Sequence, residues 1–399
     1  MKDEKKAPKL RFKGFTDDWE QVKYGEIFQR KSKMSVSTPA LPSIEYDDIN
    51  PGMGTLNKEP KSKVTSKRGI YFNPGDVLFG KLRPYLKNWL FACFEGVAVG
   101  DFWVLTSSKI DHGFTYSLIQ APEFQYIANL SSGSKMPRSD WGLVSNARTF
   151  IPTNLSEQKS ISSVLFGLDT AITLHEEKKR QLELLKSALL QKMFADKSGY
   201  PAVRFEGFSD EWEQCKLSDI SEKSYEKNTD NKYSTVLTNS AEYGIVKQRD
   251  FFDKDIANSS NISGYYVVRK NYFIYNPRIS NQAKFGPINR NKLDETGIMS
   301  PLYLVFTVHN IDESFLETLF QTTTWHRFMY QNGDTGARAD RFAIKDSTFM
   351  SMPIKVPTLE EQHKLAFAFQ KLDRTITLHV QKLSLLKRVK QTLLQKMFI

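Results

Sequence analysis

The chain has 399 residues, of which 40% are hydrophobic and 25% charged, values typical of a folded globular protein with two or three domains. No apolar stretch approaches the roughly 20 residues that cross a bilayer, and no hydrophobic segment follows the charged N-terminus, so we expect a cytoplasmic protein without a membrane span. Two cysteines, Cys93 and Cys215, are too few for a disulfide framework or a four-ligand zinc site, so we expect no bound metal. The net charge of +11 hints at nucleic acid, but the excess is spread thinly along the chain.

Two pairs of internal repeats organise the chain. Residues 11–21 (RFKGFTDDWEQ) recur as residues 204–214 (RFEGFSDEWEQ), with eight of eleven positions identical. A longer segment, residues 155–194, recurs as residues 359–398. The order is therefore short motif, variable segment and long segment, followed by the same three again, which predicts a pseudo-two-fold internal repeat.

The variable segments, about 22–154 and 215–357, predict mixed α+β domains large enough to fold alone. Their short apolar runs are bounded by Gly, Pro and Asn, a pattern typical of strands and turns. We expect short helices near 114–130 and 312–330.

Basic and amide side chains gather in the loop-like parts of both variable segments, where they could contact phosphates or base edges. Near the end of each segment, Gly133-x4-Arg138 is echoed by Gly336-x4-Arg341. For any single loop a solvated surface is the simpler interpretation, and the recurrence of such loops favours binding. The candidates for DNA contacts are Lys58, Lys61, Lys63, Lys67, Arg68, Lys81, Arg83, Lys135, Arg138, Arg278, Asn281, Gln282, Lys284, Arg338 and Arg341.

The repeated long segments predict two helices that pair as a coiled coil. Each follows a proline and begins with acidic residues, and apolar positions recur with 4-3 spacing over five heptads. The alternative is an amphipathic helix lying on a globular domain. The predicted seam consists of Ile161, Leu165, Leu168, Ile172, His175, Leu182, Leu189 and Met193 in the first helix, and Leu365, Phe369, Leu372, Ile376, His379, Leu383, Leu386, Leu393 and Met397 in the second.

Chain order requires the two helices to run antiparallel, because the second begins where the second domain ends. At 1.5 Å per residue each would be roughly 55 Å long. His175 and His379 stand at the midpoints of their seams and should meet, which could specify the register of pairing. The alternative is that each imidazole tips to the rim and is solvated.

The sequence thus predicts an α+β protein with two mixed α/β domains separated by a long antiparallel two-helix coiled coil. The expected divisions are a first domain at 1–154, a first helix at 155–199, a second domain at 200–357 and a second helix at 358–399.

Catalytic motifs are not apparent in the sequence. Gly75 to Lys81 fits the first seven positions of a P-loop, but Leu82 follows where Ser or Thr is required. We find no dinucleotide-binding fingerprint, no Asn/Asp-Pro-Pro-aromatic signature of amino-methyltransferases and no HExxH motif. We therefore expect no catalysis by the chain alone.

Several of these motifs together resemble a known family. The RFxGFxDxW pattern before each variable segment, the helix entries Leu155-Ser156-Glu157-Gln158 and Leu359-Glu360-Glu361-Gln362, and the Leu-Leu-Gln-Lys-Met-Phe endings are similar to the DNA specificity subunit of type I restriction–modification enzymes. The resemblance covers essentially the whole chain. The variable segments resemble the target-recognition domains of that family in position and length only.

The resemblance implies that each domain reads one half of a bipartite, asymmetric site on double-stranded DNA and that the helices set the unread spacer. It further implies two modification subunits that methylate adenine with S-adenosylmethionine, and restriction subunits that use ATP and Mg²⁺. This chain would bind no cofactor itself. Exposed Lys and Arg of residues 382–396 are our candidates for docking the modification subunits.

Two alternatives remain open at this stage. One is a non-catalytic, two-headed scaffold that binds proteins or RNA. The other, which is weaker, is an undiscovered nuclease in one head.

Overall fold

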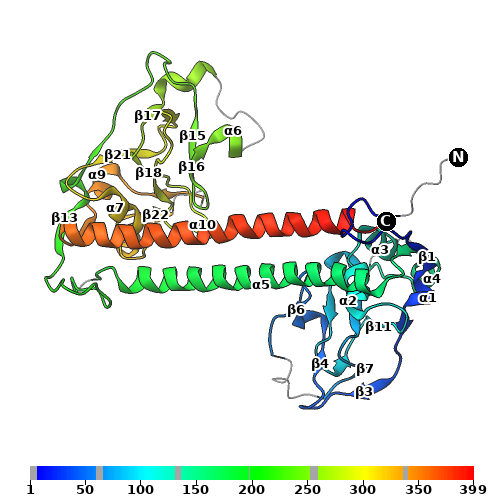
Figure 1. Cartoon of the computed structure of the whole chain (residues 1–399). Coiled ribbons are helices and arrows are strands. Elements are labelled where there is room, and N and C mark those ends of the chain that lie inside the picture. The colour runs from blue at the N-terminus through cyan, green and yellow to red at the C-terminus, as the bar shows by residue number, and fades with distance from the viewer. Residues whose placement is uncertain (1–6, 60–65, 131–135, 197, 252–258, 336–339) are drawn as a thin grey trace. The chain divides into compact units, whose positions relative to one another are not determined.

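The structure is a computed structural model that describes residues 7–59, 66–130, 136–196, 198–251, 259–335 and 340–399 (Figure 1). The chain forms two compact units. Unit 1 comprises Met1–Lys179 and Leu378–Ile399, and unit 2 comprises Arg180–Thr377. Each long helix therefore contributes one part to each unit. Among the described residues, no helix is long and apolar enough to span a membrane.

Unit 1 contains two four-stranded sheets and a two-stranded one, with strand orders β2-β11-β8-β9, β3-β7-β10-β4 and β1-β12. A further hairpin pairs β5 with β6. The strands are β1 (Glu20–Lys23), β2 (Gln29–Arg30), β3 (Met34–Val36), β4 (Ser43–Ile44), β5 (Ile49–Asn50), β6 (Thr55–Leu56), β7 (Arg68–Phe72), β8 (Val77–Gly80), β9 (Trp89–Phe91), β10 (Gly96–Ala98), β11 (Phe102–Thr106) and β12 (Arg148–Ile151). The helices are α1 (Tyr24–Ile27), α2 (His112–Leu118), α3 (Pro122–Ala128) and α4 (Trp141–Asn146), with 3₁₀ turns η1 (Tyr46–Asp48) and η3 (Pro84–Leu86).

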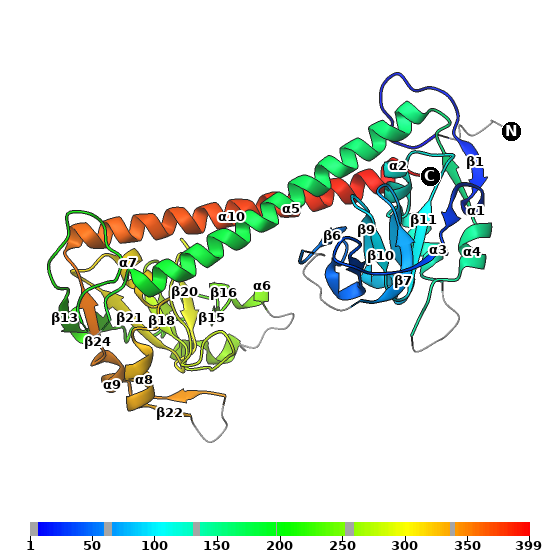
Figure 2. The ribbon, with the colours of Figure 1, turned by 90° about the horizontal axis from the view of Figure 1, so that it is seen from below.

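Alternation along the central strands β8 and β11 buries both of their faces. Figure 2 shows β11 and β9 of this sheet. Val77 and Phe79 face the helices, where they join one apolar cluster with Phe114. Leu78 faces the other sheet, where it joins a second cluster with Phe72. The strands β8 and β11 therefore form a buried middle layer of unit 1.

Unit 2 repeats this construction. Its central sheet has the order β14-β21-β18-β19, and its two-stranded sheets are β13-β24, β15-β16, β17-β20 and β22-β23. The strands are β13 (Glu213–Lys216), β14 (Ser221–Lys223), β15 (Leu237–Ser240), β16 (Gly244–Lys247), β17 (Tyr266–Val268), β18 (Phe273–Tyr275), β19 (Ile288–Arg290), β20 (Gly297–Met299), β21 (Leu304–Val308), β22 (Asp334–Thr335), β23 (Phe342–Ala343) and β24 (Pro353–Val356). The helices are α6 (Gln248–Phe251), α7 (Glu313–Leu319), α8 (His326–Asn332) and α9 (Asp346–Met350), with 3₁₀ turns η4 (Leu217–Asp219) and η5 (Ser259–Gly264).

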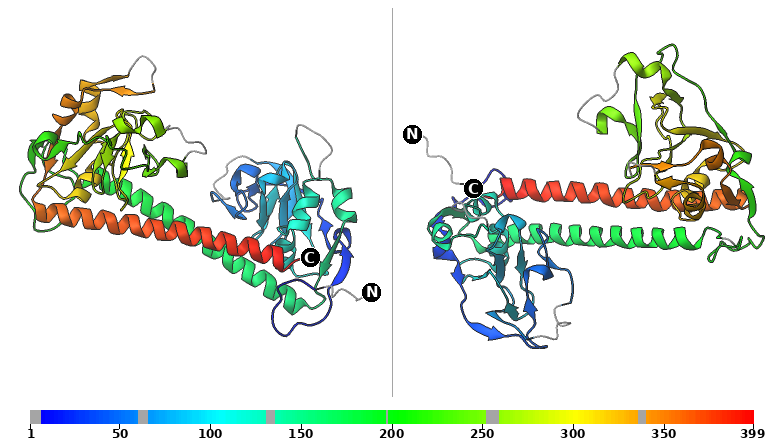
Figure 3. Two further views of the ribbon diagram at one scale, coloured as in Figure 1. Left: turned by 90° about the horizontal axis from the view of Figure 1, so that it is seen from above. Right: turned by 180° about the vertical axis from the view of Figure 1, so that it is seen from behind.

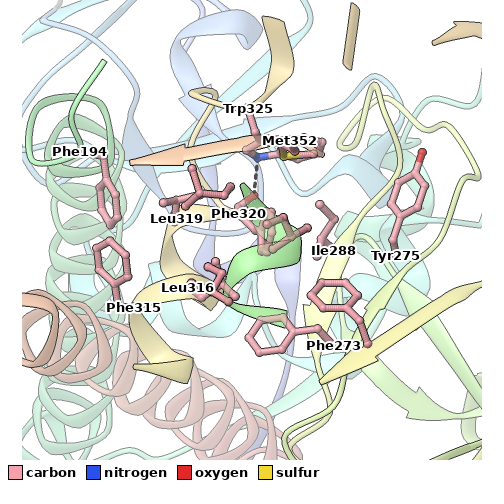
Figure 4. Packing of buried hydrophobic residues seen from close by; sticks show 14 of the residues in the cluster. Phe194, Phe273, Tyr275, Ile288, Phe315, Leu316, Leu319, Phe320, Trp325 and Met352 are labelled. Atoms are coloured by element: carbon pink, nitrogen blue, oxygen red, sulfur yellow. Dashed lines mark hydrogen bonds between the residues drawn. The ribbon is translucent and has the colours of Figure 1, made fainter. Parts of the chain in front are cut away.

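The core of unit 2 lies on the helix-facing side of this sheet (Figure 4). Phe273 and Phe315 are fully buried there. Trp325 closes the cluster, and its indole Nε1 donates to the Phe320 carbonyl oxygen at 3.2 Å. The predicted helix near 312–330 is two helices, α7 and α8, just as the one near 114–130 is α2 and α3.

The long helices are α5 (Leu155–Lys192) and α10 (Leu359–Lys396) (Figure 3). The predicted span 155–199 was wrong at its end, because Met193 and Phe194 leave the helix and enter the core of unit 2. In the same way Met397 and Phe398 follow α10 into the core of unit 1, where Phe398 stacks on Phe114 at 5.7 Å. The Met-Phe pair that follows each long helix thus packs in a hydrophobic core and anchors the end of that helix. The four-part domain division stays a prediction.

Within each unit α5 and α10 run antiparallel. In unit 1, the predicted meeting of the histidines is confirmed, since His175 Nδ1 lies 2.9 Å from His379 Nδ1. Every predicted seam residue, in both helices, is buried or half-buried.

Two ion pairs flank the histidines and were missed by the heptad pattern. In unit 1, Lys390 contacts Asp169 at 2.5 Å, and in unit 2, Lys186 contacts Asp373 at 2.6 Å. The four residues are two copies of one pair under the repeat offset, so the helix register is marked by matched charges as well as by apolar side chains.

The repeated short motif anchors the start of each long helix. Arg11 donates to both carboxylate oxygens of Glu157, at 2.6 and 2.8 Å, and Arg204 donates to both of Glu361, at 2.8 and 2.7 Å. Both glutamate side chains are only 1% exposed. In each unit, therefore, the short repeated motif supplies the arginine and the repeated long helix supplies the glutamate of the same buried ion pair.

The glutamine after each glutamate ties the helix entry to a short helix. Gln158 accepts from the backbone N–H of Asp111, whose carboxylate caps α2. Gln362 accepts from the N–H of Asp312, which caps α7. The Glu-Gln pair at the helix entry is thus a structural joint.

Candidate nucleic-acid interface

In unit 1, two of the predicted basic loops are brought together at one edge of the central sheet. The chain leaving β8 forms an isolated bridge with the later loop, between Leu82 and Arg138. The Arg83 N–H donates to the Pro137 carbonyl, and the Ser139 N–H donates to the Lys81 carbonyl, both at 2.8 Å. We name this the Leu82–Arg138 edge.

Asp101 organises the cations of the Leu82–Arg138 edge. Its carboxylate lies 3.6 Å from Lys81 Nζ and 3.0 Å from Arg138 Nη2. The Tyr46 hydroxyl donates to the Asp101 carbonyl at 2.5 Å and accepts from the Leu82 N–H at 3.1 Å, and burial raises the pKa of Tyr46 to about 12. Arg138 stays 61% exposed, so it is held in place while its guanidinium faces solvent.

Unit 2 builds the same edge from different side chains. Arg278, after β18, forms an isolated bridge with Arg341. The Ile279 N–H donates to the Asp340 carbonyl at 2.9 Å, and the Phe342 N–H donates to the Pro277 carbonyl at 2.8 Å. These bonds match those of unit 1 one for one, so Arg278 occupies the place of Leu82, and Arg341 that of Arg138. We name this the Arg278–Arg341 edge.

Both arginines of the Arg278–Arg341 edge are exposed. Within the described part of the chain, no acidic side chain pairs with Arg278 or Arg341. Two such guanidinium groups on bridged loop segments suit a polyanion, because each brings a charge and several donors.

Buried amides shape the loop that follows Arg278. Asn276 accepts from the Arg278 N–H at 3.0 Å and donates to the Asn239 carbonyl at 2.9 Å. Gly286 has φ +83°, and a Cβ there would lie 2.0 Å from the Asn276 carbonyl oxygen, so only glycine fits. The loop between them presents the exposed candidates Asn281, Gln282 and Lys284.

Three of the remaining candidates, Lys58, Lys67 and Arg68, stand apart from the two edges. Lys58 pairs with Asp48 at 3.2 Å, and Lys67 pairs with Glu45 at 2.6 Å. Arg68 is exposed at the start of β7. Four candidates lie outside the described residues: Lys61, Lys63, Lys135 and Arg338.

A cavity of about 970 Å³ in unit 2 adjoins the Arg278–Arg341 edge and was missed by the sequence. Arg341 lines it together with Lys223, Lys345 and Tyr275. Lys223 comes from β14, more than 100 residues before Arg341, so no local signal could have joined them. Among the described residues, no group of three His, Cys, Asp or Glu side chains could hold a metal ion.

The comparison with protein families decides the identity of this fold. Residues 209–388 match the model of the type I restriction modification DNA specificity domain. Residues 209–388 are thus similar to the specificity domain of type I restriction–modification systems. The match confirms the resemblance predicted from the sequence, and the specificity domain contains the whole Arg278–Arg341 edge.

Solved structures share the fold over nearly the whole chain. The type I restriction–modification S subunit from M. genitalium is 13% identical, with TM-score 0.60 over 98% of this chain and 99% of that one. A structure on complex assembly and conformational transition of the type I R-M system is 15% identical, with TM-score 0.50 over 94% and 96%. The HsdS subunit from Thermoanaerobacter tengcongensis is 16% identical, with TM-score 0.44 over 94% and 95%. No curated protein sequence matches the chain.

The expected docking residues on α10 were the exposed Lys and Arg of residues 382–396. Lys390 is not one of them, because its side chain is 11% exposed, paired with Asp169 and bonded to Gln120 at 2.7 Å. Lys387 pairs with Glu176 at 2.6 Å. Burial against unit 1 removes Lys390 from any partner surface.

Apolar side chains instead face outward from both helices. Positions this exposed to solvent are usually occupied by charged or polar residues. The most exposed of them are Leu174 (66%), Leu378 (55%) and Leu385 (55%) in unit 1, and Leu184 (58%) and Phe367 (68%) in unit 2.

Proposed function

We propose that this chain is the DNA specificity subunit of a type I restriction–modification complex, and that each unit reads one half of a bipartite, asymmetric target. The observation that carries the proposal is the repeated edge. Identical backbone bonds hold Leu82 with Arg138 in unit 1 and Arg278 with Arg341 in unit 2. Two units with the same backbone arrangement but different side chains would read two different half-sites. Two units with the same side chains would instead require a palindromic target.

The antiparallel helices would set the unread spacer between the half-sites. Each has 38 residues, which corresponds to roughly 57 Å at 1.5 Å per residue. Half-sites one helical turn apart are separated by roughly 34–36 Å, within reach of such a pair of helices. The ion pairs and the histidine contact support a single register, which a ruler requires.

The modification subunits would dock on the outward apolar residues of α5 and α10. Exposed leucine and phenylalanine side chains on an already paired set of helices favour burial against further helices. These subunits would methylate adenine in each half-site with S-adenosylmethionine, extruding the base. Restriction subunits would add ATP- and Mg²⁺-dependent cleavage, and this chain would bind no cofactor and catalyse no step. The complex would act in the cytoplasm.

Sequencing of N6-methyladenine in the native host, with and without the gene, tests the proposal. The expected result is a motif of two different short half-sites separated by a fixed unread spacer, which is lost on deletion. A continuous or palindromic motif would contradict the two-unit reading.

Mobility-shift competition with the purified chain separates DNA binding from the scaffold alternative. Duplex DNA should compete, and equal or better competition by RNA would favour the scaffold. Arg138→Ala and Arg341→Ala should each weaken binding and lower the salt slope by about one. Lys270→Ala, at an exposed ion pair with Asp294, is the control and should leave both unchanged.

A further inference from the structure

The cavity beside the Arg278–Arg341 edge has the lining of a binding site. It measures about 970 Å³ and lies wholly within unit 2. Three tyrosines, Tyr266, Tyr275 and Tyr303, contribute aromatic surface, while Arg341 and Lys345 are exposed cations on its lining. Lys223 also lines it, but its charge is neutralised by Asp346.

Tyr275 carries a hydroxyl that packing does not explain. Its side chain is 3% exposed, and its ring stacks on Phe349 at 4.5 Å. The hydroxyl has no hydrogen-bond partner among the described residues. In Figure 4 it points away from the buried ring of Phe273. Burying a hydroxyl without a partner is unfavourable, so the Tyr275 hydroxyl is a candidate donor to a polar group bound in the cavity.

The equivalent position in unit 1 shows that a phenyl ring is sufficient for the fold. Tyr275 precedes the bridging residue Arg278 by three positions, and Phe79 precedes the bridging residue Leu82 by three. Phe79 is 1% exposed and stacks on Trp103 at 5.5 Å. The hydroxyl is therefore an addition made only where the cavity lies.

The combined chemistry selects a nucleotide. Aromatic walls stack on bases of any sequence, and Arg and Lys bind phosphate. Burial raises the pKa of Tyr275, so its hydroxyl stays protonated and can donate to a ring nitrogen or carbonyl oxygen. A volume of this size suits a small ligand.

Resting on the proposed function, we propose that this cavity binds one nucleotide, with its base against Tyr275 and its phosphate on Arg341 and Lys345. In the intact complex the nucleotide is an unpaired one of the DNA target. A free nucleotide has the same chemistry, and the two sources are distinguished by experiment.

Binding of three probes to the full-length chain tests this site. The probes are a fully paired duplex, the same duplex with one bulged 2-aminopurine nucleotide, and free dAMP. The chain should bind the bulged duplex more tightly than the paired one and quench its fluorescence. Tyr275→Phe should reduce that preference about 3- to 10-fold, the value of one hydrogen bond, without changing affinity for the paired duplex. Tyr24→Phe, which removes another buried hydroxyl in unit 1, should change neither affinity.

The outcomes separate this inference from the proposed function. If Tyr275→Phe folds, binds the paired duplex normally and retains the full preference for the bulge, the cavity holds water only and the inference fails alone. If the chain ignores both duplexes but binds dAMP in a Tyr275-dependent way, the cavity is a free-nucleotide site and the DNA function fails. Tighter binding of the bulge than of dAMP places the nucleotide in DNA.

Discussion

Removal of Arg11 should destabilise unit 1 selectively. Among the described residues, Arg11→Met leaves the Glu157 carboxylate, 1% exposed, with a single side-chain contact, from Trp19 Nε1 at 3.4 Å. Breaking a buried ion pair from one side costs about 3–5 kcal/mol, and the 13% exposure of Arg11 admits some water, so we expect about 3 kcal/mol. In a unit of about 200 residues this lowers the melting temperature by about 6–12 °C.

Differential scanning calorimetry of the full chain measures this effect. Arg204→Met removes the matching partner of Glu361 and should lower the transition of unit 2 instead. Arg148→Met is the control, because this exposed arginine bonds only to Gln21 at 3.1 Å, and its loss should cost less than about 0.5 kcal/mol.

A double variant decides whether the cost comes from the stranded charge. Arg11→Met with Glu157→Gln keeps an acceptor for Trp19 but removes the buried carboxylate, so it should recover much of the lost stability. The reasoning is refuted if Arg11→Met behaves like Arg148→Met, or if the double variant melts no higher than the single one.

Three further predictions concern the paired helices. Lys390→Met removes the cation that pairs with the Asp169 carboxylate, and burial already raises the pKa of that carboxylate. The loss of stability, measured by urea unfolding, should therefore be largest near neutral pH and should shrink as Asp169 protonates on acidification. Lys186→Met, at the more exposed matched pair, should cost less stability. Burial, with Lys382 and His379 nearby, lowers the pKa of His175, so the stability of the fold should fall as the pH drops through the ordinary histidine range. The double variant His175→Leu with His379→Leu should remove that part of the fall and raise the melting temperature. Light scattering of the double variant should reveal additional oligomers. Lengthening both helices by one heptad should change the spacer and leave the half-site sequences unchanged, as read from methylated sites; altered half-sites would contradict the ruler.

Much of the architecture could be predicted because it is written twice. Two helices with a matching heptad pattern, each starting after one domain of a repeated pair, can pair along their length only in antiparallel fashion. The helix ends could not be predicted in this way. Helix propensity continues through Met193 and Phe194, and only the apolar core of unit 2 takes them out of α5.

The candidate site could be predicted from the sequence only in part, for a related reason. Arg138 and Arg341 were found because their loops resemble each other, but their partners lie 56 and 63 positions away in the chain, at Leu82 and Arg278. Such contacts depend on which segments pair in the folded sheet, and no local sequence pattern predicts that pairing. The burial of Lys390 could not be predicted for the same reason, since Gln120, to which it bonds, belongs to another part of the chain.

Under the proposed function, the repeated frame would let such a chain change its target without losing its fold. Backbone bonds, which are indifferent to side-chain identity, join the two loops of each edge, while the buried Arg-Glu pair holds each helix entry. Leucine in one unit and arginine in the other occupy the same bridging position at no visible cost to the sheet. Exchange of Leu82 for Arg should therefore leave the melting temperature of unit 1 almost unchanged while altering its DNA half-site, and a strongly destabilised variant would show that the edge is part of the core.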